Sequence, residues 1–151
     1  MKIIGIEHIA IAVKDLDTSS PFWKHILQIP HRSTEVVESE GVTTDIYDTK
    51  KGKVELLESR GSDTPVGKFL SKKGEGIHHV CFEVDDIKQA ITELKENNIR
   101  VLSDEPRTGA EGYQVVFIHP SSAGGVLVEL AQKPHYCLLY TSDAADELSC
   151  V

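Results

Sequence analysis

Two histidines and two glutamates in this 151-residue chain have the residue types and spacing of a metal-binding set: His8, Glu55, His79 and Glu129. Two neutral imidazoles and two carboxylates suit a divalent ion of borderline hardness, such as cobalt, manganese, nickel or zinc. Four protein ligands leave octahedral positions open for water or for a substrate. The chemistry predicted from these residues is that of a metalloenzyme.

An internal repeat supports this set. Residues 5–16 read Gly-Ile-Glu-His-Ile-Ala-Ile-Ala-Val-Lys-Asp-Leu, and residues 76–87 read Gly-Ile-His-His-Val-Cys-Phe-Glu-Val-Asp-Asp-Ile. Each copy is followed by a Val-Glu-Leu segment, at residues 54–56 and at residues 128–130. A lone histidine or glutamate in a strand is more often structural or solvated than a ligand. Independent surface residues need not recur in register, however, so the repetition favours metal ligation.

Strand alternation predicts that the four side chains share one face of a sheet. His8 lies opposite Ile9 and Ile11, and Glu55 lies opposite its two apolar neighbours. The second copy has the same arrangement around its histidine and its glutamate. If the apolar faces pack on helices, all four polar side chains point to the other face. A sheet that curls around that face would bring them together.

Four further side chains near this pattern have other predicted roles. His78 and Glu7 precede the two histidines and are predicted to support them or to be structural. His119 lies in a turn beside a proline, where both capping and substrate contact remain open. Cys81 shares the face of the second histidine and is predicted to be a small core-lining residue.

Composition excludes several classes of function. The net charge of −8 argues against non-specific nucleic-acid binding and against binding to an anionic membrane surface. No apolar run has the length of a membrane span. The three cysteines do not form a disulfide framework. Because strand-like sequence begins at once, no signal peptide is predicted. The cytoplasm is the expected compartment, with the mitochondrial matrix as the alternative for a eukaryotic protein, although no transit peptide is seen.

One domain is predicted over residues 1–133. It comprises modules 4–60 and 75–132, with a connecting helix at 61–74. Residues 134–151 have no counterpart in the repeat. They are predicted to be a tail outside the domain, disordered or artefactual, and are excluded from function.

Within the modules, alternating segments predict strands at 5–13, 42–48, 53–58, 76–84, 114–118 and 125–131. The first module's helix is expected to begin near Ser19 or the next residue, because Pro21 is tolerated only in a first turn. The second module's helix is expected to run from about Asp86 to Asn97 or Asn98.

Taken together, these motifs resemble the vicinal oxygen chelate (glyoxalase/bleomycin resistance/dioxygenase) superfamily, and within it the methylmalonyl-CoA epimerases. The resemblance covers about residues 4–132 and is carried by Glu-His-Ile-Ala-Ile-Ala-Val at 7–13, Val-Glu-Leu-Leu-Glu at 54–58, Ser-Asp-Thr-Pro-Val at 62–66, Gly-Glu-Gly-Ile-His-His-Val at 74–80, Asp-Glu-Pro-Arg at 104–107, Phe-Ile-His-Pro-Ser at 117–121 and Gly-Val-Leu-Val-Glu-Leu at 125–130.

The resemblance implies an α+β fold in which two βαβββ modules form an open, curled mixed sheet around a central metal site. The family's metal ligands fall on His8, Glu55, His79 and Glu129. The implied cofactor is a divalent metal ion, with cobalt as the first choice and manganese, nickel or zinc as alternatives.

The activity implied by the resemblance is metal-dependent epimerisation of (2R)- and (2S)-methylmalonyl-CoA, by 1,1-proton transfer at C2 through an enediolate. Glu129 is the predicted catalytic group for one proton transfer. The second group is open between Glu55, a bound water and a residue of the 40–48 segment. Some family members carry a glutamate where this chain has Thr44, and threonine is no base.

Two alternatives share the fold: a glyoxalase I-type lactoylglutathione lyase and a metal-free small-molecule binding or resistance protein. The expected partner is a CoA thioester, and a homodimer is one expectation for the assembly. Basic side chains that could meet the CoA phosphates are Lys50, Lys51, Lys53, Lys72, Lys73 and Arg107.

Overall fold

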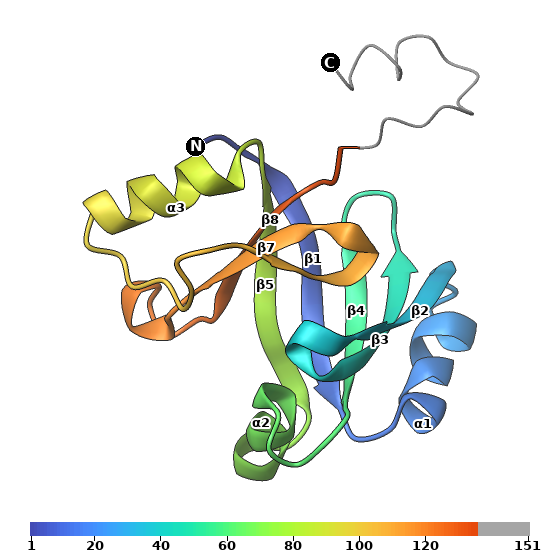
Figure 1. Cartoon of the computed structure of the whole chain (residues 1–151). Helices are drawn as coiled ribbons and strands as arrows, with labels where there is room; N and C mark the ends of the chain where they lie inside the picture. Colours follow the sequence, from blue (N-terminus) through green and yellow to red (C-terminus); the bar gives the residue numbers. More distant parts are fainter. Residues whose placement is uncertain (136–151) are drawn as a thin grey trace, which may run out of the picture.

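One curled, eight-stranded mixed sheet forms the frame of the computed structural model, which describes residues 1–135 (Figure 1). The first half contributes the strands β1 (Ile3–Val13), β2 (His31–Val37), β3 (Val42–Asp48) and β4 (Lys53–Ser59). The second half contributes β5 (Gly76–Val84), β6 (Arg107–Thr108), β7 (Gln114–Ile118) and β8 (Val128–Gln132). Residues 136–151 of the predicted tail lie outside the described residues.

The strand order β2-β3-β4-β1-β5-β8-β7-β6 shows two halves built on one plan. In each half the first strand pairs in parallel with the last, as β1 pairs with β4 and β5 with β8. The halves join through the antiparallel pair β1–β5. The predicted α+β fold with an open, curled mixed sheet is confirmed.

In the described part of the chain, three α-helices pack around this sheet: α1 (Leu16–Pro21), α2 (Pro65–Lys73) and α3 (Ile87–Glu96). The side chain of Asp86 caps α3 by accepting a hydrogen bond from the backbone N–H of Gln89 at 3.1 Å. Helix α3 buries its apolar stripe against the outer face of the second half, and α1 covers the outer face of the first. The opposite, inner face carries the predicted polar set, and α2 packs on the part of that face formed by Ala10, Ala12 and Leu57.

The first helix differs from its prediction. It begins at Leu16, because Asp15 caps it by accepting a hydrogen bond from the N–H of Asp17 at 2.8 Å. Pro21 is its last residue rather than part of its first turn. The chain continues as a wider π turn, in which the N–H of Leu27 donates to the carbonyl of Phe22 at 2.9 Å. The proline therefore ends regular α-helical hydrogen bonding without ending the helical path.

The other differences are at strand edges and turns. Periodicity did not predict the strands β2 and β6, both at the sheet edges, where polar residues interrupt the alternation. Strand β8 begins at Val128 rather than at residue 125, because Gly124 and Gly125 both have positive φ angles and form a turn. Among the described residues, no helix is both long and apolar enough to span a membrane.

Candidate metal centre and active site

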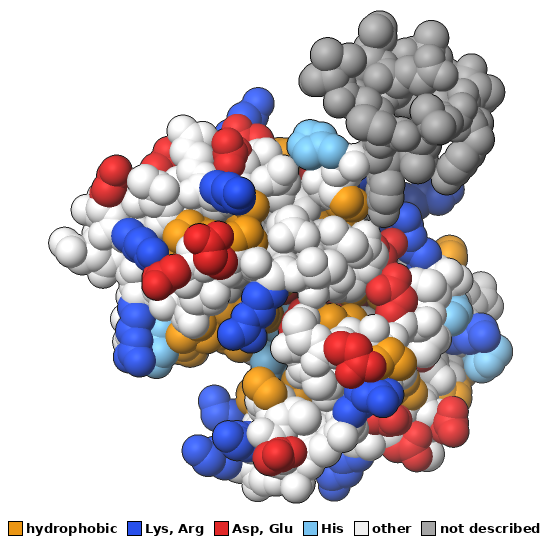
Figure 2. All heavy atoms as spheres, viewed as in Figure 1, with side chains coloured by type: hydrophobic (Ala, Val, Ile, Leu, Met, Phe, Trp, Pro, Cys, Tyr) orange, Lys and Arg blue, Asp and Glu red, His pale blue; other side chains and the backbone are white. Residues whose placement is uncertain are grey.

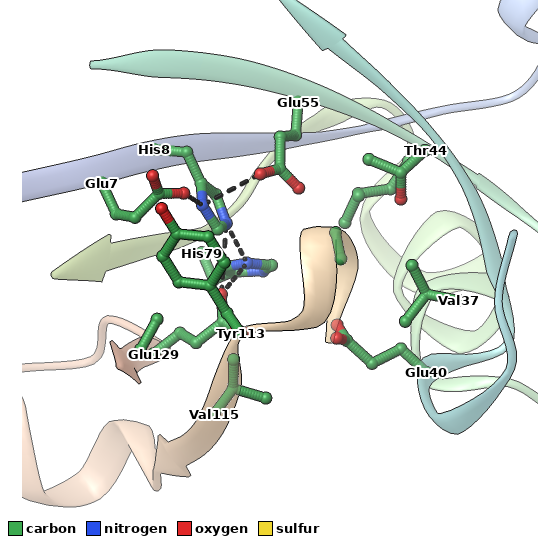
Figure 3. Close-up of a pocket in the computed structure, with 13 residues that line it drawn as sticks. Glu7, His8, Val37, Glu40, Thr44, Glu55, His79, Tyr113, Val115 and Glu129 are labelled. Carbon is green, nitrogen blue, oxygen red and sulfur yellow. Dashed lines mark hydrogen bonds and ion pairs between the residues drawn. The ribbon is translucent and has the colours of Figure 1, made fainter. Parts of the chain in front are cut away.

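The four predicted ligands are all buried on the inner face of the sheet, with 6% or less of each residue exposed. The Nε2 atoms of His8 and His79 lie 3.2 Å apart. One carboxylate oxygen of Glu129, Oε1, lies 3.1 Å from the Nε2 of His8 and 3.0 Å from that of His79. Three donor atoms from β1, β5 and β8 therefore converge on one point (Figure 3).

Glu55 contacts the His8 ring on the side opposite to Glu129. Its Oε2 atom lies 3.0 Å from the Nδ1 atom of His8, not from the Nε2 atom that meets Glu129. The structure thus places Glu55 beside the three converging donors rather than among them. All four residues lie together, and their roles as ligands stay a prediction.

Strand register explains the convergence. His8 is paired with Cys81 of β5, which is itself paired with Glu129 of β8. In the other half, His79 is paired with Ala10, which is paired with Glu55. Cys81 and Ala10 are completely buried, so the small core-lining role predicted for Cys81 is confirmed. These small residues leave room above the sheet for the larger polar side chains.

A β-bulge precedes each histidine. On β1, Ile6 and His8 pair with consecutive residues of β5, so Glu7 is the extra residue. His78 is the extra residue on β5. The Glu7 carboxylate therefore contacts the Nδ1 of His8 at 2.9 Å, and the Nδ1 atoms of His78 and His79 lie 2.9 Å apart. Glu7 and His78 therefore support the two histidines, which is one of the two roles predicted for them.

The donor atoms suit a divalent metal ion. The Oε1 atom of Glu129 is buried without a hydrogen-bond donor among the described residues. Ligand atoms about 2.1 Å from a metal and at right angles to one another lie about 3.0 Å apart, which matches the spacing of this oxygen and the two imidazole nitrogens. Two imidazoles and a carboxylate are borderline-hard donors. The cluster therefore fits the divalent ion expected from the sequence.

Burial and mutual charge shift the pKa values of these groups. Burial, with the Glu129 and Glu7 carboxylates nearby, raises the pKa of Glu55 to about 7. Glu129 is also buried, but its contacts with His79 and His8 hold its pKa well below the usual range. Burial lowers the pKa of His78 to about 4, with a further contribution from His79, so this imidazole is neutral at physiological pH.

A cavity opens above the cluster. Besides the four predicted ligands, it is lined by Glu7, Thr44, Glu40, Tyr113 and Val115. A second, largely apolar cavity of about 160 Å³ shares Glu40 and Val115 with the first. Figure 2 shows a hollow with hydrophobic side chains on its walls and basic side chains at its rim. Sequence reasoning did not single out Glu40 or Tyr113, since both lie in turns outside any alternating segment.

Two of the six predicted basic contacts, Arg107 and Lys53, differ in what surrounds them. Arg107 lines the larger cavity, where a ligand could meet it. Lys53 does not remain available, because its Nζ atom pairs with Glu7 at 2.8 Å and with Glu111 at 2.7 Å. His119 caps a short 3₁₀ turn, accepting a hydrogen bond at Nδ1 from the N–H of Ser121 at 3.0 Å.

Comparison with known proteins identifies the family. Residues 7–117 match the family described as the glyoxalase/bleomycin resistance protein/dioxygenase superfamily. The chain belongs to this superfamily. Its curled sheet with a polar inner face agrees with that membership, and the resemblance read from the sequence motifs is confirmed.

Several superfamily members are similar over most of the chain. The mitochondrial methylmalonyl-CoA epimerase of Bos taurus is 44% identical over 128 residues, covering 84% of this chain and 73% of the relative. The ethylmalonyl-CoA/methylmalonyl-CoA epimerase of Cereibacter sphaeroides is 40% identical, covering 84% of this chain and 96% of the relative. A solved methylmalonyl-CoA epimerase in complex with methylmalonyl-CoA and NH₄⁺ is 36% identical with a TM-score of 0.83, covering 87% and 96% of the two chains.

Proposed function

We propose that this chain interconverts (2R)- and (2S)-methylmalonyl-CoA by moving the proton at C2, with the help of a divalent metal ion. The observation that carries the proposal is the buried convergence of His8, His79 and Glu129 beneath a cavity. Similarity to methylmalonyl-CoA epimerases at 40% to 44% identity supports this substrate. Cobalt is the proposed ion, with manganese, nickel or zinc as alternatives, because the donors mix imidazole and carboxylate.

The substrate's chemistry matches the site. The C2 hydrogen lies between a thioester carbonyl and a carboxylate, and its removal places negative charge on the thioester oxygen. A divalent ion bound at the cluster supplies Lewis-acid stabilisation of that charge. The protein contributes a buried, fixed set of dipoles and charges, which needs little rearrangement as the charge develops.

Glu129 is the proposed proton-transfer group on one face of C2. Contacts with the two histidines hold its pKa low, so the carboxylate is ionised, as a group that accepts the C2 proton must be. The larger cavity, with Arg107 in its wall, is the proposed path for the CoA arm. A guanidinium there can pair with a phosphate or a carboxylate through two parallel hydrogen bonds.

A homodimer is the proposed assembly. Large apolar side chains on the two central strands support it, since Ile4, Ile6 and Ile77 are each more than half exposed. Sedimentation velocity should give a mass of twice the chain. A single species at the mass of one chain, at the concentrations used in activity assays, would contradict it.

Deuterium exchange tests the function directly. The metal-loaded protein should incorporate deuterium at C2 of methylmalonyl-CoA in deuterated water and produce the other epimer, and a chelator should stop both. Turnover of a glutathione hemithioacetal without C2 exchange would instead favour the glyoxalase-type lyase. Absence of any bound divalent ion would exclude both enzymatic functions and leave the metal-free binding protein.

A further inference from the structure

We propose that Glu40 is the second proton-transfer group, acting on C2 from the side of the cavity opposite Glu129. This inference rests on the proposed epimerase function and extends it. Figure 3 shows the Glu40 carboxylate turned into the cavity, across from the cluster formed by His8, His79 and Glu129.

Epimerisation itself requires two groups. The C2–H bond breaks, its proton passes to one carboxylate, and the electron pair moves onto the thioester oxygen. The pair then returns to C2 and takes a proton from a carboxylic acid on the opposite face, which inverts the centre. One carboxylate ends protonated and the other ionised, and exchange with water or a turnover in reverse restores both.

Other carboxylates near the cavity do not fill this position. Glu55 and Glu7 both contact the Nδ1 atom of His8, so they lie on the same side as the metal cluster. Asp45 faces a different pocket and is occupied by a hydrogen bond from the hydroxyl of Tyr47 at 3.1 Å. Thr44 lines the cavity but carries only a hydroxyl. Glu40 is the carboxylate on the far wall.

The backbone places Glu40 there. It ends the short 3₁₀ turn η2 (Glu38–Glu40), and Gly41 follows in the left-handed conformation with φ 65°, which turns the chain into β3. A Cβ atom on Gly109 would lie 3.3 Å from the Oε2 atom of Glu40, so the carboxylate packs against the Gly109 backbone. The absence of a side chain at Gly109 therefore leaves room for the carboxylate at this position.

The surroundings of Glu40 also suit proton transfer. It lines both cavities, so a thioester that enters through the larger one reaches Glu40 on its way to the metal cluster. Burial, with the Glu129 and Glu55 carboxylates facing it, raises the pKa of Glu40 to about 8. A carboxyl group with such a pKa can both donate and accept a proton near neutral pH.

The Glu40→Gln variant tests the assignment with each pure epimer in deuterated water. Inversion should fall by about 100-fold or more from both epimers. The epimer whose hydrogen faces Glu129 should still incorporate deuterium with retention of configuration. The other epimer should lose both exchange and inversion. The proposal would be overturned if the variant inverted C2 at the wild-type rate. It would also be overturned if deuterium exchange were kept in both epimers or lost in both.

Three controls make the result specific. Glu38→Gln removes a charge from an exposed position of the same turn and should leave inversion unchanged. Metal content should stay at the wild-type level in Glu40→Gln. Glu40→Asp, which keeps the acid but retracts it by one methylene, should invert faster than Glu40→Gln, and equal rates would contradict the assignment. If the wild-type protein neither exchanges nor inverts, the proposed function fails instead.

Discussion

At the scale of single residues, the two histidines are fixed through the nitrogen that does not face the cluster. The Nδ1 atom of His8 contacts Glu7 at 2.9 Å and Glu55 at 3.0 Å, and that of His79 lies 2.9 Å from the Nδ1 of His78. Such partners set the tautomer and the orientation of a metal-binding imidazole. They leave both Nε2 atoms directed at the Oε1 of Glu129.

Replacing either histidine should therefore remove metal binding. His8→Ala and His79→Ala should each lose stoichiometric divalent metal, because two of the converging donors cannot hold the ion without the third. Elemental analysis after dialysis measures the bound metal. His25→Ala, at an exposed position, is the matched control and should keep full occupancy. Full occupancy in either of the first two variants would show that the ligand assignment is wrong.

At the scale of secondary structure, the start of α2 depends on a missing side chain. Thr64 caps this helix by accepting a hydrogen bond from the N–H of Gly67 at 3.0 Å. A Cβ atom on Gly67 would collide with the carbonyl oxygen of Gly61 and lie 2.9 Å from the Oγ atom of Ser59. The helix therefore packs directly on the backbone that follows β4.

Gly67→Ala should destabilise the fold, although alanine is the better helix former. Overpacking against a backbone group should cost about 1–3 kcal/mol, which exceeds the gain of about 1 kcal/mol from helix propensity. Urea denaturation monitored by circular dichroism measures the change. Ser71→Ala, on the exposed side of the same helix, should be neutral or slightly stabilising. Equal stability of the two variants would contradict this packing argument.

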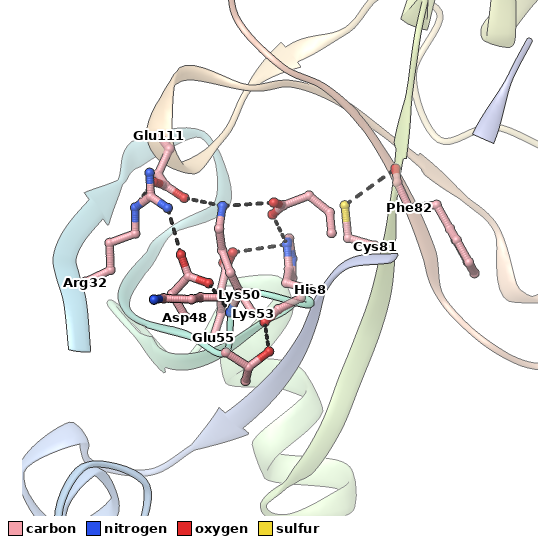
Figure 4. Close-up of polar contacts among 12 residues, drawn as sticks. His8, Arg32, Asp48, Lys50, Lys53, Glu55, Cys81, Phe82 and Glu111 are labelled. Carbon is pink, nitrogen blue, oxygen red and sulfur yellow. Dashed lines mark hydrogen bonds and ion pairs between the residues drawn. The ribbon is translucent and has the colours of Figure 1, made fainter. Parts of the chain in front are cut away.

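At the scale of the whole molecule, a short loop of the second half is fastened to the first half. Glu111 belongs to the turn η3 (Ala110–Gly112) and pairs with Lys53 at 2.7 Å and with Arg32 at 2.9 Å (Figure 4). Its backbone N–H donates to a carboxylate oxygen of Glu35 at 2.9 Å. Since Ala110 of this turn lines the cavity, these contacts position part of the cavity wall.

Glu111→Gln should weaken the connection between the halves. The side chain of Lys53 is only 9% exposed, so losing one of its two carboxylate partners should cost about 1–3 kcal/mol. Asp104→Asn breaks the Lys95–Asp104 pair, which is exposed, and should cost well under about 1 kcal/mol. Denaturation midpoints of the two variants decide between these expectations. Equal midpoints would show that the loop contact adds no stability.

The fold and much of the site could be predicted from the sequence because both follow local patterns. Asp86 and the apolar stripe after it predicted α3 correctly, and the hairpin of β3 and β4 followed from alternation around a lysine-rich turn. The first helix was placed too late, because a proline in sequence does not reveal that a π turn can follow it. Strand β2 was missed because its half-buried positions Ser33 and Glu35 carry polar side chains, so its sequence does not alternate apolar with polar residues.

The sequence by itself determined the repeat and, through it, the half-by-half plan of the sheet. It also determined that His8, Glu55, His79 and Glu129 share one face, because side chains alternate along a strand whatever its neighbours are. Only the tertiary structure decided that bulges turn Glu7 and His78 toward the histidines, that ion pairs occupy Lys53, and that Glu40 faces the cavity. These placements depend on strand register and on the path of turns between distant segments. No local pattern contains that information, since it arises when the two halves pack together.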